Sequence, residues 1–539
     1  MLAKIYGAAL HGVEAFLVTI EVSITKGLGY QITGLPDETI RESLSRISVA
    51  IQDAGFEMPR TKLLIHLSPA HLRKSGSAFD LPIAIGILLA SGQVHDIGKL
   101  SQYVLAGELA LDGKILPIRA ALCMSELALR NKISGIVVPQ ANASEAALIN
   151  GTEVFGVQHL QQVLEFLKAD YALHPCVIGP VRNYLQSPDL PDFKHVIGQE
   201  NLKRAMEIAA AGGHHTLMVG PPGTGKSLAA KCLPSILPPM NDREVLEATK
   251  IYSILNHGDA LQGLMHTRPF RTVHHTISDA GLIGGGLYAA PGEITLAHNG
   301  VLFMDELSEF RPAALEALRQ PLEDRKIIVA RSRLVMEYPA AFMLVAAMNP
   351  CLCGYYGHPS KKCTCSKRAL YWYRRKISGP LLDRLDVQVE TDPIDNGQLL
   401  QCVPALSEPS SSIRKRVWNA RQIQELRFAD DPLIHCNAMM SGAAIHQWCS
   451  MDDHTRRFLQ RSLETSMHSG RGVHKILKVA RTIADLAGSV PIELGHVAEA
   501  IHFRTLDKPL ITAPASTHTK ASSPIIHLTK LNGYDHPRF

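Results

Sequence analysis

Eight residues, Gly220, Pro221, Pro222, Gly223, Thr224, Gly225, Lys226 and Ser227, match the pattern Gly-x-x-x-x-Gly-Lys-Ser. The apolar segment TLMV precedes them and SLAAKCL follows, and this strand–loop–helix context is what makes the pattern specific for a nucleotide. Glycines let successive backbone N–H groups face phosphates, Lys226 can reach the β- and γ-phosphates, and Ser227 can hold Mg²⁺. The alternative, a chance glycine turn, does not account for the context. The stretch predicts an ATP site.

Two further apolar runs end in polar residues. GVLFMDEL ends in Asp305 and Glu306, where a buried strand would deliver Asp305 to Mg²⁺ and Glu306 to a position that polarises water. FMLVAAMNP ends at Asn349, which could orient the attacking water. An isolated acidic pair would more often be a solvated turn, but its place after a phosphate-binding loop favours catalysis.

Arg384 stands between two aspartates in SGPLLDRLDV. One interpretation is a surface ion-pair network. The other is an arginine finger that completes the nucleotide site of a neighbouring subunit, which requires an oligomer.

Four cysteines follow Asn349 as two Cys-x-Cys pairs, in NPCLCGYYGHPSKKCTCS. Tetrahedral sulfur coordination suits Zn²⁺, and the Gly-rich spacer is long enough to fold the chain back. The predicted ligands of this structural zinc are Cys351, Cys353, Cys363 and Cys365, with His358 as a substitute. A redox or incidental cluster is the alternative.

The segment SKRALYWYRRKIS interleaves basic and aromatic residues, and two other segments could line the pore of a ring. Basic side chains neutralise phosphates and aromatic rings stack on exposed bases, but a helix with a buried aromatic face fits the segment equally well. We hypothesise that the cysteine loop braces a DNA-contacting surface near Arg384. The residues of the basic and aromatic segment that carry the hypothesis are Lys367, Arg368, Tyr371, Trp372, Tyr373, Arg374, Arg375 and Lys376.

The pore candidates are the Gly-rich ISDAGLIGGGLYAAPGEI and the hairpin-like EDRKIIVARSRLVMEYP, with Arg331 and Arg333 near its turn. Core-packing turns are the alternative interpretation of both segments.

Composition indicates the compartment. Of 539 residues, 46% are hydrophobic, enough for ordinary cores, and the net charge of +5 permits a nucleic-acid partner without demanding one. The N-terminus has no clean signal-peptide core, and the longest apolar run, Leu81 to Ala90, is too short to span a bilayer. The other six cysteines are scattered singly, which indicates a reducing compartment. We expect a cytoplasmic protein without membrane contact.

The elements that must position these residues form an α/β multidomain chain. Residues 1–168 alternate strand-like and helix-like patterns, and 169–192 is a proline-rich linker. Residues 193–392 alternate again and contain the cysteine insert 351–365. Residues 393–506 are mostly helical, and 507–539 read as a weakly ordered tail.

The motifs together resemble the ComM/YifB family of magnesium-chelatase-like AAA+ ATPases. The resemblance rests on FRTVHHTISDAGLIGGG, PGEITLAHNGVLFMDELSEF, AAMNPCLCGYYGH, SGPLLDRLD and ILKVARTIADLAG, and it covers residues 1 to about 506. It implies an AAA+ P-loop core with ATP and Mg²⁺, in which Asn349 is the first sensor and Arg384 the arginine finger. A second sensor arginine is implied in a C-terminal helical lid, where Arg471 fits best and Arg481 is the runner-up.

The segment RKSGSAFDLPIAIGILLASGQ, followed by YVLAGELALDGKILPIRAAL, resembles the proteolytic domain of Lon proteases, which implies an S5-like α/β domain for residues 1–168. Ser77, in GSAF, occupies the position of the nucleophile. Leu122 occupies the position of the lysine base and cannot accept a proton, so we expect no peptidase chemistry. The domain is expected to serve assembly or substrate contact.

Three functions follow as expectations. The first is a homo-hexameric motor that promotes branch migration of single-stranded and branched DNA, including recombinase-coated DNA, during natural transformation. The second is a protein-remodelling or magnesium-chelatase-type ATPase, which does not explain the cysteine loop. The third, an ATP-dependent protease, is disfavoured by Leu122.

Overall fold

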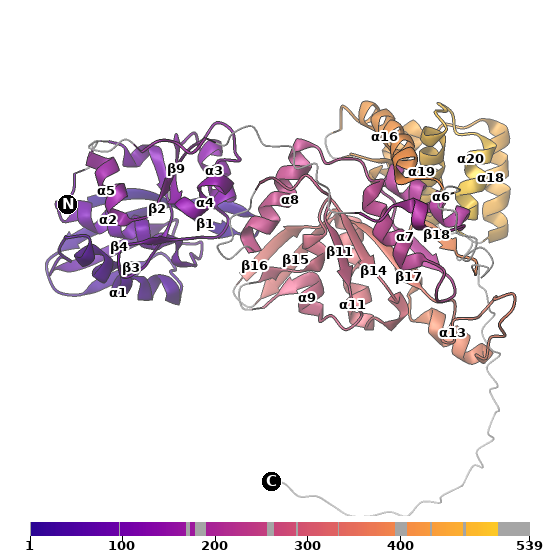
Figure 1. Ribbon diagram of the computed structural model, residues 1–539, viewed down its shortest axis with the longest axis horizontal. Coiled ribbons are helices and arrows are strands. Elements are labelled where there is room, and N and C mark those ends of the chain that lie inside the picture. The colour runs from indigo at the N-terminus through magenta and orange to yellow at the C-terminus, as the bar shows by residue number, and fades with distance from the viewer. Residues whose placement is uncertain are drawn as a thin grey trace, which may run out of the picture.

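The computed structural model describes ten stretches of the chain, in three domains (Figure 1). The tail 507–539, most of the linker 169–192, and residues 394–406 lie outside the described residues. The described ranges are 2–95, 98–168, 173–177, 190–255, 263–286, 289–331, 334–393, 407–431, 434–466 and 470–504.

The N-terminal domain is a seven-stranded mixed sheet with helices on both faces, in the strand order β3-β4-β2-β1-β5-β8-β9. The alternating patterns of residues 1–168 are therefore confirmed as an α/β unit. Its strands are β1 (Leu2–His11), β2 (Glu14–Thr25), β3 (Tyr30–Thr33), β4 (Lys62–Ser68), β5 (Tyr103–Leu105), β8 (Gly135–Pro139) and β9 (Glu153–Val157), with β6 (Glu108–Leu109) and β7 (Ile115–Leu116) in a separate ladder. Its helices are α1 (Glu38–Asp53), α2 (Asp80–Ala90), α3 (Ala121–Arg130), α4 (Gln140–Ala146) and α5 (Leu160–Lys168).

The central domain contains five parallel strands in the order β11-β14-β17-β10-β18. The inner strands are almost wholly apolar because helices cover both faces of a parallel sheet. Ligands bind at the carboxyl ends of such strands, where the strand order reverses, and here that point is β10. The strands are β10 (Thr216–Val219), β11 (Phe270–Val273), β14 (Val301–Met304), β17 (Met343–Met348) and β18 (Val387–Glu390).

The remaining elements of the central domain surround this sheet. Two small antiparallel ladders pair β12 (Gly284–Gly285) with β13 (Ala290–Pro291) and β15 (Lys326–Arg331) with β16 (Leu334–Pro339). The second ladder confirms the predicted hairpin. The helices are α6 (Glu200–Gly212), α7 (Lys226–Cys232), α8 (Asp242–Leu255), α9 (Asp279–Ile283), α10 (Glu293–Leu296), α11 (Pro312–Ala317), α12 (Arg319–Asp324), α13 (Lys367–Arg375) and α14 (Gly379–Leu382).

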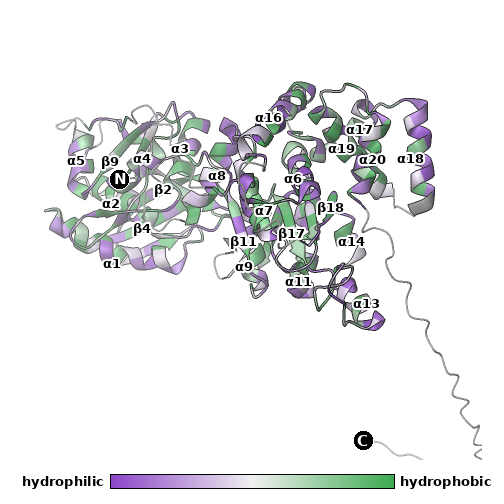
Figure 2. Cartoon of the chain, turned by 45° about the vertical axis from the view of Figure 1, so that its right-hand side comes forward, coloured by the Kyte–Doolittle hydropathy of each residue, from purple (hydrophilic) through white to green (hydrophobic). Residues whose placement is uncertain are grey.

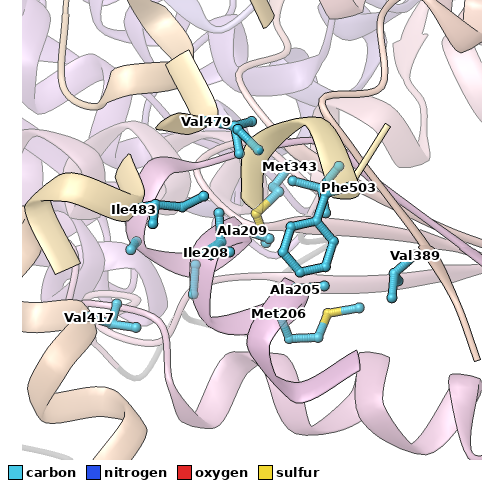
Figure 3. Close-up of a cluster of buried hydrophobic side chains, with 14 of the residues drawn as sticks. Ala205, Met206, Ile208, Ala209, Met343, Val389, Val417, Val479, Ile483 and Phe503 are labelled. Atoms are coloured by element: carbon cyan, nitrogen blue, oxygen red, sulfur yellow. The ribbon is translucent and has the colours of Figure 1, made fainter. Parts of the chain in front are cut away.

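The C-terminal domain is helical and shares one hydrophobic core with the central domain. Helix α6 lies between them, and Figure 3 shows its Ala205, Met206, Ile208 and Ala209 among side chains from both sides. The C-terminal helical domain therefore packs on the sheet of the central domain, with α6 between them. Figure 2 shows apolar residues concentrated along the strands and polar residues on the outer helix faces. The helices are α16 (Ser410–Arg427), α17 (Gly442–Trp448), α18 (Asp453–Ser466), α19 (Gly470–Leu486) and α20 (Leu494–His502).

Helix α8 connects the N-terminal domain to the central domain. Ser253 donates a hydrogen bond to the buried Glu145, and Lys250 forms an ion pair with Glu126. The backbone N–H of Ala120 also donates to the carbonyl of Ser253 at 3.2 Å. The N-terminal domain is thus held by polar contacts to a helix of the nucleotide-binding unit. Among the helices that the structure describes, none is both long and apolar enough to cross a membrane.

Candidate nucleotide site and cysteine cluster

The phosphate-binding loop lies between β10 and α7, at the carboxyl edge of the sheet. Gly223 and Gly225 both have φ of 82°, in the left-handed region that favours glycine. The ammonium of Lys226 donates to the carbonyl oxygens of Gly220 and Pro221, each at 2.7 Å. Burial lowers the pKa of Lys226 to about 8, although the carboxylate of Asp305 acts in the opposite direction. The lysine ammonium is therefore held inside the loop by two backbone carbonyl oxygens.

Ser227 and Asp305 lie together. The Ser227 hydroxyl donates to Oδ2 of Asp305 at 2.6 Å, and the two residues come from the start of α7 and the end of β14. A hydroxyl and a carboxylate at this separation suit Mg²⁺, which takes oxygen ligands and keeps several waters. The donor set therefore fits the predicted cation.

Glu306 has an unusual backbone and an exposed side chain. Its φ is 51°, a left-handed conformation rare for a non-glycine residue, and its side chain is 56% exposed. Nδ1 of His275 lies 3.5 Å from its carboxylate. His275 comes just after β11, the strand that pairs with β14, and the sequence motifs did not assign it a role. The arrangement directs a carboxylate, oriented by an imidazole, towards solvent beside the phosphate-binding loop.

Asn349 and Thr391 lie just after the two strands that flank β10. The register pairs Val219 with Met348 and with Glu390, so both residues lie level with Gly220. Thr391 contacts Thr224 through their hydroxyls at 2.8 Å. Asn349 is thus at the predicted edge of the site, and Thr391 is a contact that the motifs missed, although a polar residue at a strand end was the available signal.

The predicted arginines contact residues outside this loop. Arg384 forms an ion pair with Glu323 at 2.9 Å and donates to the carbonyl of Arg319 at 3.1 Å. Arg471, 66% exposed at the start of α19, lies 3.3 Å from the same carboxylate. Arg481 is buried and donates to Asp485 and to the carbonyls of Ser489 and Val490, all within the lid. Of the two sensor candidates, Arg471 faces outward and Arg481 belongs to the lid interior.

The four predicted cysteines come together. All four Sγ atoms lie within 4.8 Å of one another, and Sγ of Cys351 is 3.3 Å from that of Cys353 and 3.7 Å from that of Cys363. A tetrahedral zinc with Zn–S bonds of about 2.3 Å would separate its sulfurs by about 3.8 Å. Backbone hydrogen bonds of Tyr355 and Thr364 lower the pKa of the Cys353 thiol to about 5. The set is compatible with zinc, with Cys365 as its fourth member.

His358 is not part of this cluster. Its Nδ1 accepts hydrogen bonds from the backbone N–H groups of Ser360 and Lys361, at 3.1 and 3.0 Å. The histidine therefore orders the spacer between the cysteine pairs.

The cysteine loop contacts the phosphate-binding loop. Gly354 has φ of 81°, and a Cβ placed on it would lie 2.9 Å from Cδ of Pro222. Behind the loop, α13 is anchored by Tyr373, whose hydroxyl accepts a hydrogen bond of 2.7 Å from Ser308, three residues after Asp305. Leu370 and Tyr373 are buried, whereas Trp372 is exposed. The interpretation as a helix with a buried aromatic face is thus confirmed for Leu370 and Tyr373, and contact of the exposed face with DNA stays a prediction.

The two pore candidates differ in how far their apolar side chains are exposed. In the Gly-rich segment, Leu282, Ala289 and Ile294 are fully buried, which favours the core-packing alternative there. The β15–β16 hairpin exposes Ile328 and Val335. The Arg331 side chain and Arg333 lie outside the described residues.

In the N-terminal domain, Ser77 donates a hydrogen bond to Glu108. Leu122 is fully buried in α3, and its backbone N–H donates to Glu145 at 3.2 Å. The residue at the position of the lysine base thus belongs to the domain core.

Comparison with known protein families gives matches along most of the chain. The family "Subunit ChlI of Mg-chelatase" matches residues 20–142, "Magnesium chelatase, subunit ChlI" matches 192–399, and "Magnesium chelatase, subunit ChlI C-terminal" matches 407–504.

Individual relatives are similar over nearly their whole length. An uncharacterised protein from Salmonella typhimurium, YifB, is 40% identical over 512 residues, which is 95% of this chain and 98% of that protein. The competence protein ComM of Haemophilus influenzae is 38% identical over 509 residues, 94% of this chain and 98% of that protein. Lon protease 2 of Bacillus subtilis is 31% identical over 150 residues, 25% of this chain and 26% of the protease.

Proposed function

Since the chain belongs to the magnesium-chelatase-like family that contains YifB and ComM, we propose that it hydrolyses ATP to move DNA strands. The particular activity that we infer is branch migration by a ring of six copies, in homologous recombination and in natural transformation. The single observation that carries the ATPase part is the meeting of Lys226, Ser227, Asp305 and Glu306 at one edge of the sheet. The DNA part is supported by the full-length similarity to a competence protein.

Each residue has a role in this proposal. Lys226 and the backbone N–H groups of the loop would bind the phosphates, and Ser227 and Asp305 would hold Mg²⁺, which would supply positive charge to offset the charge that develops on the phosphates. Glu306, oriented by His275, polarises the attacking water, and Asn349 helps to place it. Arg384 completes the site of the next subunit.

A second candidate, a magnesium-chelatase-type or protein-remodelling ATPase, is favoured by one observation. All three matching family models describe a magnesium chelatase subunit. Added DNA speeds the ATP hydrolysis of a DNA motor. It does not speed the ATP hydrolysis of an enzyme that remodels proteins or inserts a metal.

The deciding experiment is ATP-dependent branch migration of a synthetic three- or four-stranded junction, with wild type and Glu306→Gln compared. Strand displacement by wild type alone supports the motor. No displacement, together with ATP hydrolysis that added DNA does not change, would reject it in favour of the second candidate.

A further inference from the structure

The surface around α13 carries an uncompensated positive charge. Between Cys351 and Ile377 the chain has no acidic residue. Figure 1 shows α13 projecting from the central domain, at the side away from the N-terminal domain. In the part of the chain that the structure describes, only Lys376 of the seven basic residues forms an ion pair, with Glu309 at 3.5 Å. The seven are Lys361, Lys362, Lys367, Arg368, Arg374, Arg375 and Lys376.

An exposed tryptophan lies within this charge. Trp372 is 55% exposed, although its large apolar ring would normally be covered. The Arg375 guanidinium lies 5.6 Å from the Trp372 ring centre and 5.7 Å from that of Tyr371. Arg375 also donates to the Tyr371 hydroxyl at 3.0 Å. The Arg375 guanidinium thus lies over the indole ring, while more than half of Trp372 remains exposed to solvent.

We propose that this α13 surface binds single-stranded nucleic acid, with Trp372 stacking on a base and Lys367, Arg368 and Arg375 contacting phosphates. Open aromatic faces beside basic groups are the features that bind single strands without sequence preference. An acidic protein segment would satisfy the charge but would not need an exposed indole. The inference rests on the proposed function and specifies where the moving strand is contacted.

The surface is joined to the nucleotide site from two sides. The cysteine loop packs against Pro222 of the phosphate-binding loop through Gly354. Tyr373, on the buried face of α13, bonds to Ser308 beyond the catalytic strand β14. Because the cysteine loop and Tyr373 contact both segments, we expect the affinity for single strands to depend on the bound nucleotide.

The test uses the full chain and a fluorescein-labelled oligothymidylate, with binding followed by anisotropy. We expect Trp372→Ala to weaken binding about tenfold and Trp372→Phe to retain most of it, because any aromatic face can stack. Trp418→Ala, which removes a partly exposed tryptophan of the C-terminal helical domain, is the matched control.

Lys367→Gln combined with Arg368→Gln should reduce the slope of log affinity against log salt by about 1.4, roughly 0.7 per charge. Arg457→Gln on the lid controls for charge alone. Thermal melting confirms that each variant is folded.

The outcomes separate this inference from the proposed function. If wild type binds the oligonucleotide but Trp372→Ala behaves like Trp418→Ala, the α13 site is rejected while the DNA motor stands. Poly-glutamate is the probe for acidic protein in the same assay. If Trp372→Ala weakens the binding of poly-glutamate but not of the oligothymidylate, the surface recognises acidic protein and the inference is overturned. If wild type binds no oligonucleotide and DNA does not stimulate its ATP hydrolysis, the proposed function fails as well.

Discussion

Arg384 is bound within its own chain by Glu323, at 2.9 Å. The same carboxylate lies 3.3 Å from Arg471 of the lid, so two arginines from different domains converge on one acidic side chain. An arginine that serves a neighbouring subunit, the role that we propose for Arg384, must leave this contact with Glu323.

The first prediction concerns Arg384 acting between subunits. Arg384→Ala should lower ATP turnover by about 10³-fold or more, the range measured for arginine fingers. Mixed with equally inactive Glu306→Gln subunits it should regain activity, because an intact site of one then meets an intact arginine of the other. Steady-state hydrolysis at several mixing ratios measures this. A mixture no more active than its components would place Arg384 outside the neighbouring site.

The second prediction separates binding from hydrolysis at Glu306. Glu306→Gln should lower kcat by about 10²–10⁴-fold, the usual contribution of a general base. It should leave ATP affinity within about twofold, because no phosphate ligand is lost. Glu309→Gln, which alters a nearby carboxylate paired with Lys376, serves as control. A kcat of Glu306→Gln close to wild type would mean that another group activates the water.

The third prediction is a pH dependence of ATP binding. Because burial lowers the pKa of Lys226 to about 8, the ammonium loses its proton in the free protein as pH rises past this value. The affinity for a non-hydrolysable ATP analogue should then fall by up to about tenfold per pH unit. Calorimetry from pH 7 to 9.5 measures it. Lys226→Arg, whose charge persists, should bind more weakly but without this pH dependence.

The lowered pKa of Lys226 also makes the free energy of unfolding depend on pH. The unfolded chain binds more protons at Lys226 than the folded chain between about pH 8 and the ordinary lysine pKa of 10.5. The contribution of this residue to the free energy of unfolding therefore rises with pH across that window. A wild-type ATP affinity that does not change between pH 7 and 9.5 would contradict both statements.

The fourth prediction concerns the cysteine cluster. Purified protein should contain one zinc per chain by elemental analysis, and Cys363→Ser should lose it and melt at a lower temperature, because metal binding contributes to folding. Cys176→Ser, in the N-terminal part of the chain, should change neither quantity. Wild-type protein with no zinc and a melting temperature insensitive to chelators would argue for the redox alternative.

The fifth prediction concerns the joint between β18 and the lid. Asp386 is fully buried, lies 3.3 Å from His214 and pairs with Lys475 of α19. Although burial opposes it, Lys475 and His214 hold the pKa of Asp386 well below its ordinary value of 3.8. Its stabilisation is therefore complete above that ordinary value and is lost as pH falls through the lowered pKa.

Asp386→Asn should accordingly lower the free energy of unfolding at neutral pH by about 3 kcal/mol, since it leaves a cation without its partner. Asp383→Asn, in the same segment but only partly buried, should have little effect. Urea denaturation at pH 7 compares them. Equal stabilities would show that Lys475 finds another partner.

Sequence patterns predicted that the residues of the candidate nucleotide site lie at one edge of the sheet, because the parts of that site are local. A Gly-rich loop and two apolar strands ending in Asp305 and Asn349 are recognisable one by one, and parallel strands bring their carboxyl ends to one edge. His275 escaped notice because its strand, Phe270–Val273, lies at the sheet edge and carries Arg271 and Thr272, so no apolar run marks it.

Contacts between distant segments could not be predicted in this way. The pairing of Arg384 with Glu323 depends on how α12 and α14 pack, which no local pattern encodes. Likewise, adjacent residues Trp372 and Tyr373 have opposite exposure because only the packed helix decides which ring faces the core. The burial of the Gly-rich pore candidate follows from its contacts with the hairpin, such as Tyr338 donating to the carbonyl of Ala289 at 2.7 Å.

The length and position of helix α8 determine how far a tilt of this helix displaces the N-terminal domain. It follows the phosphate-binding helix α7 after a short buried turn, and its far end contacts the N-terminal domain through Ser253. Its 14 residues make a lever arm about 21 Å long, so a tilt of about 10° at one end displaces the other by roughly 4 Å. In the motor that we propose, the N-terminal domain would therefore be displaced by about this distance in each cycle of ATP hydrolysis.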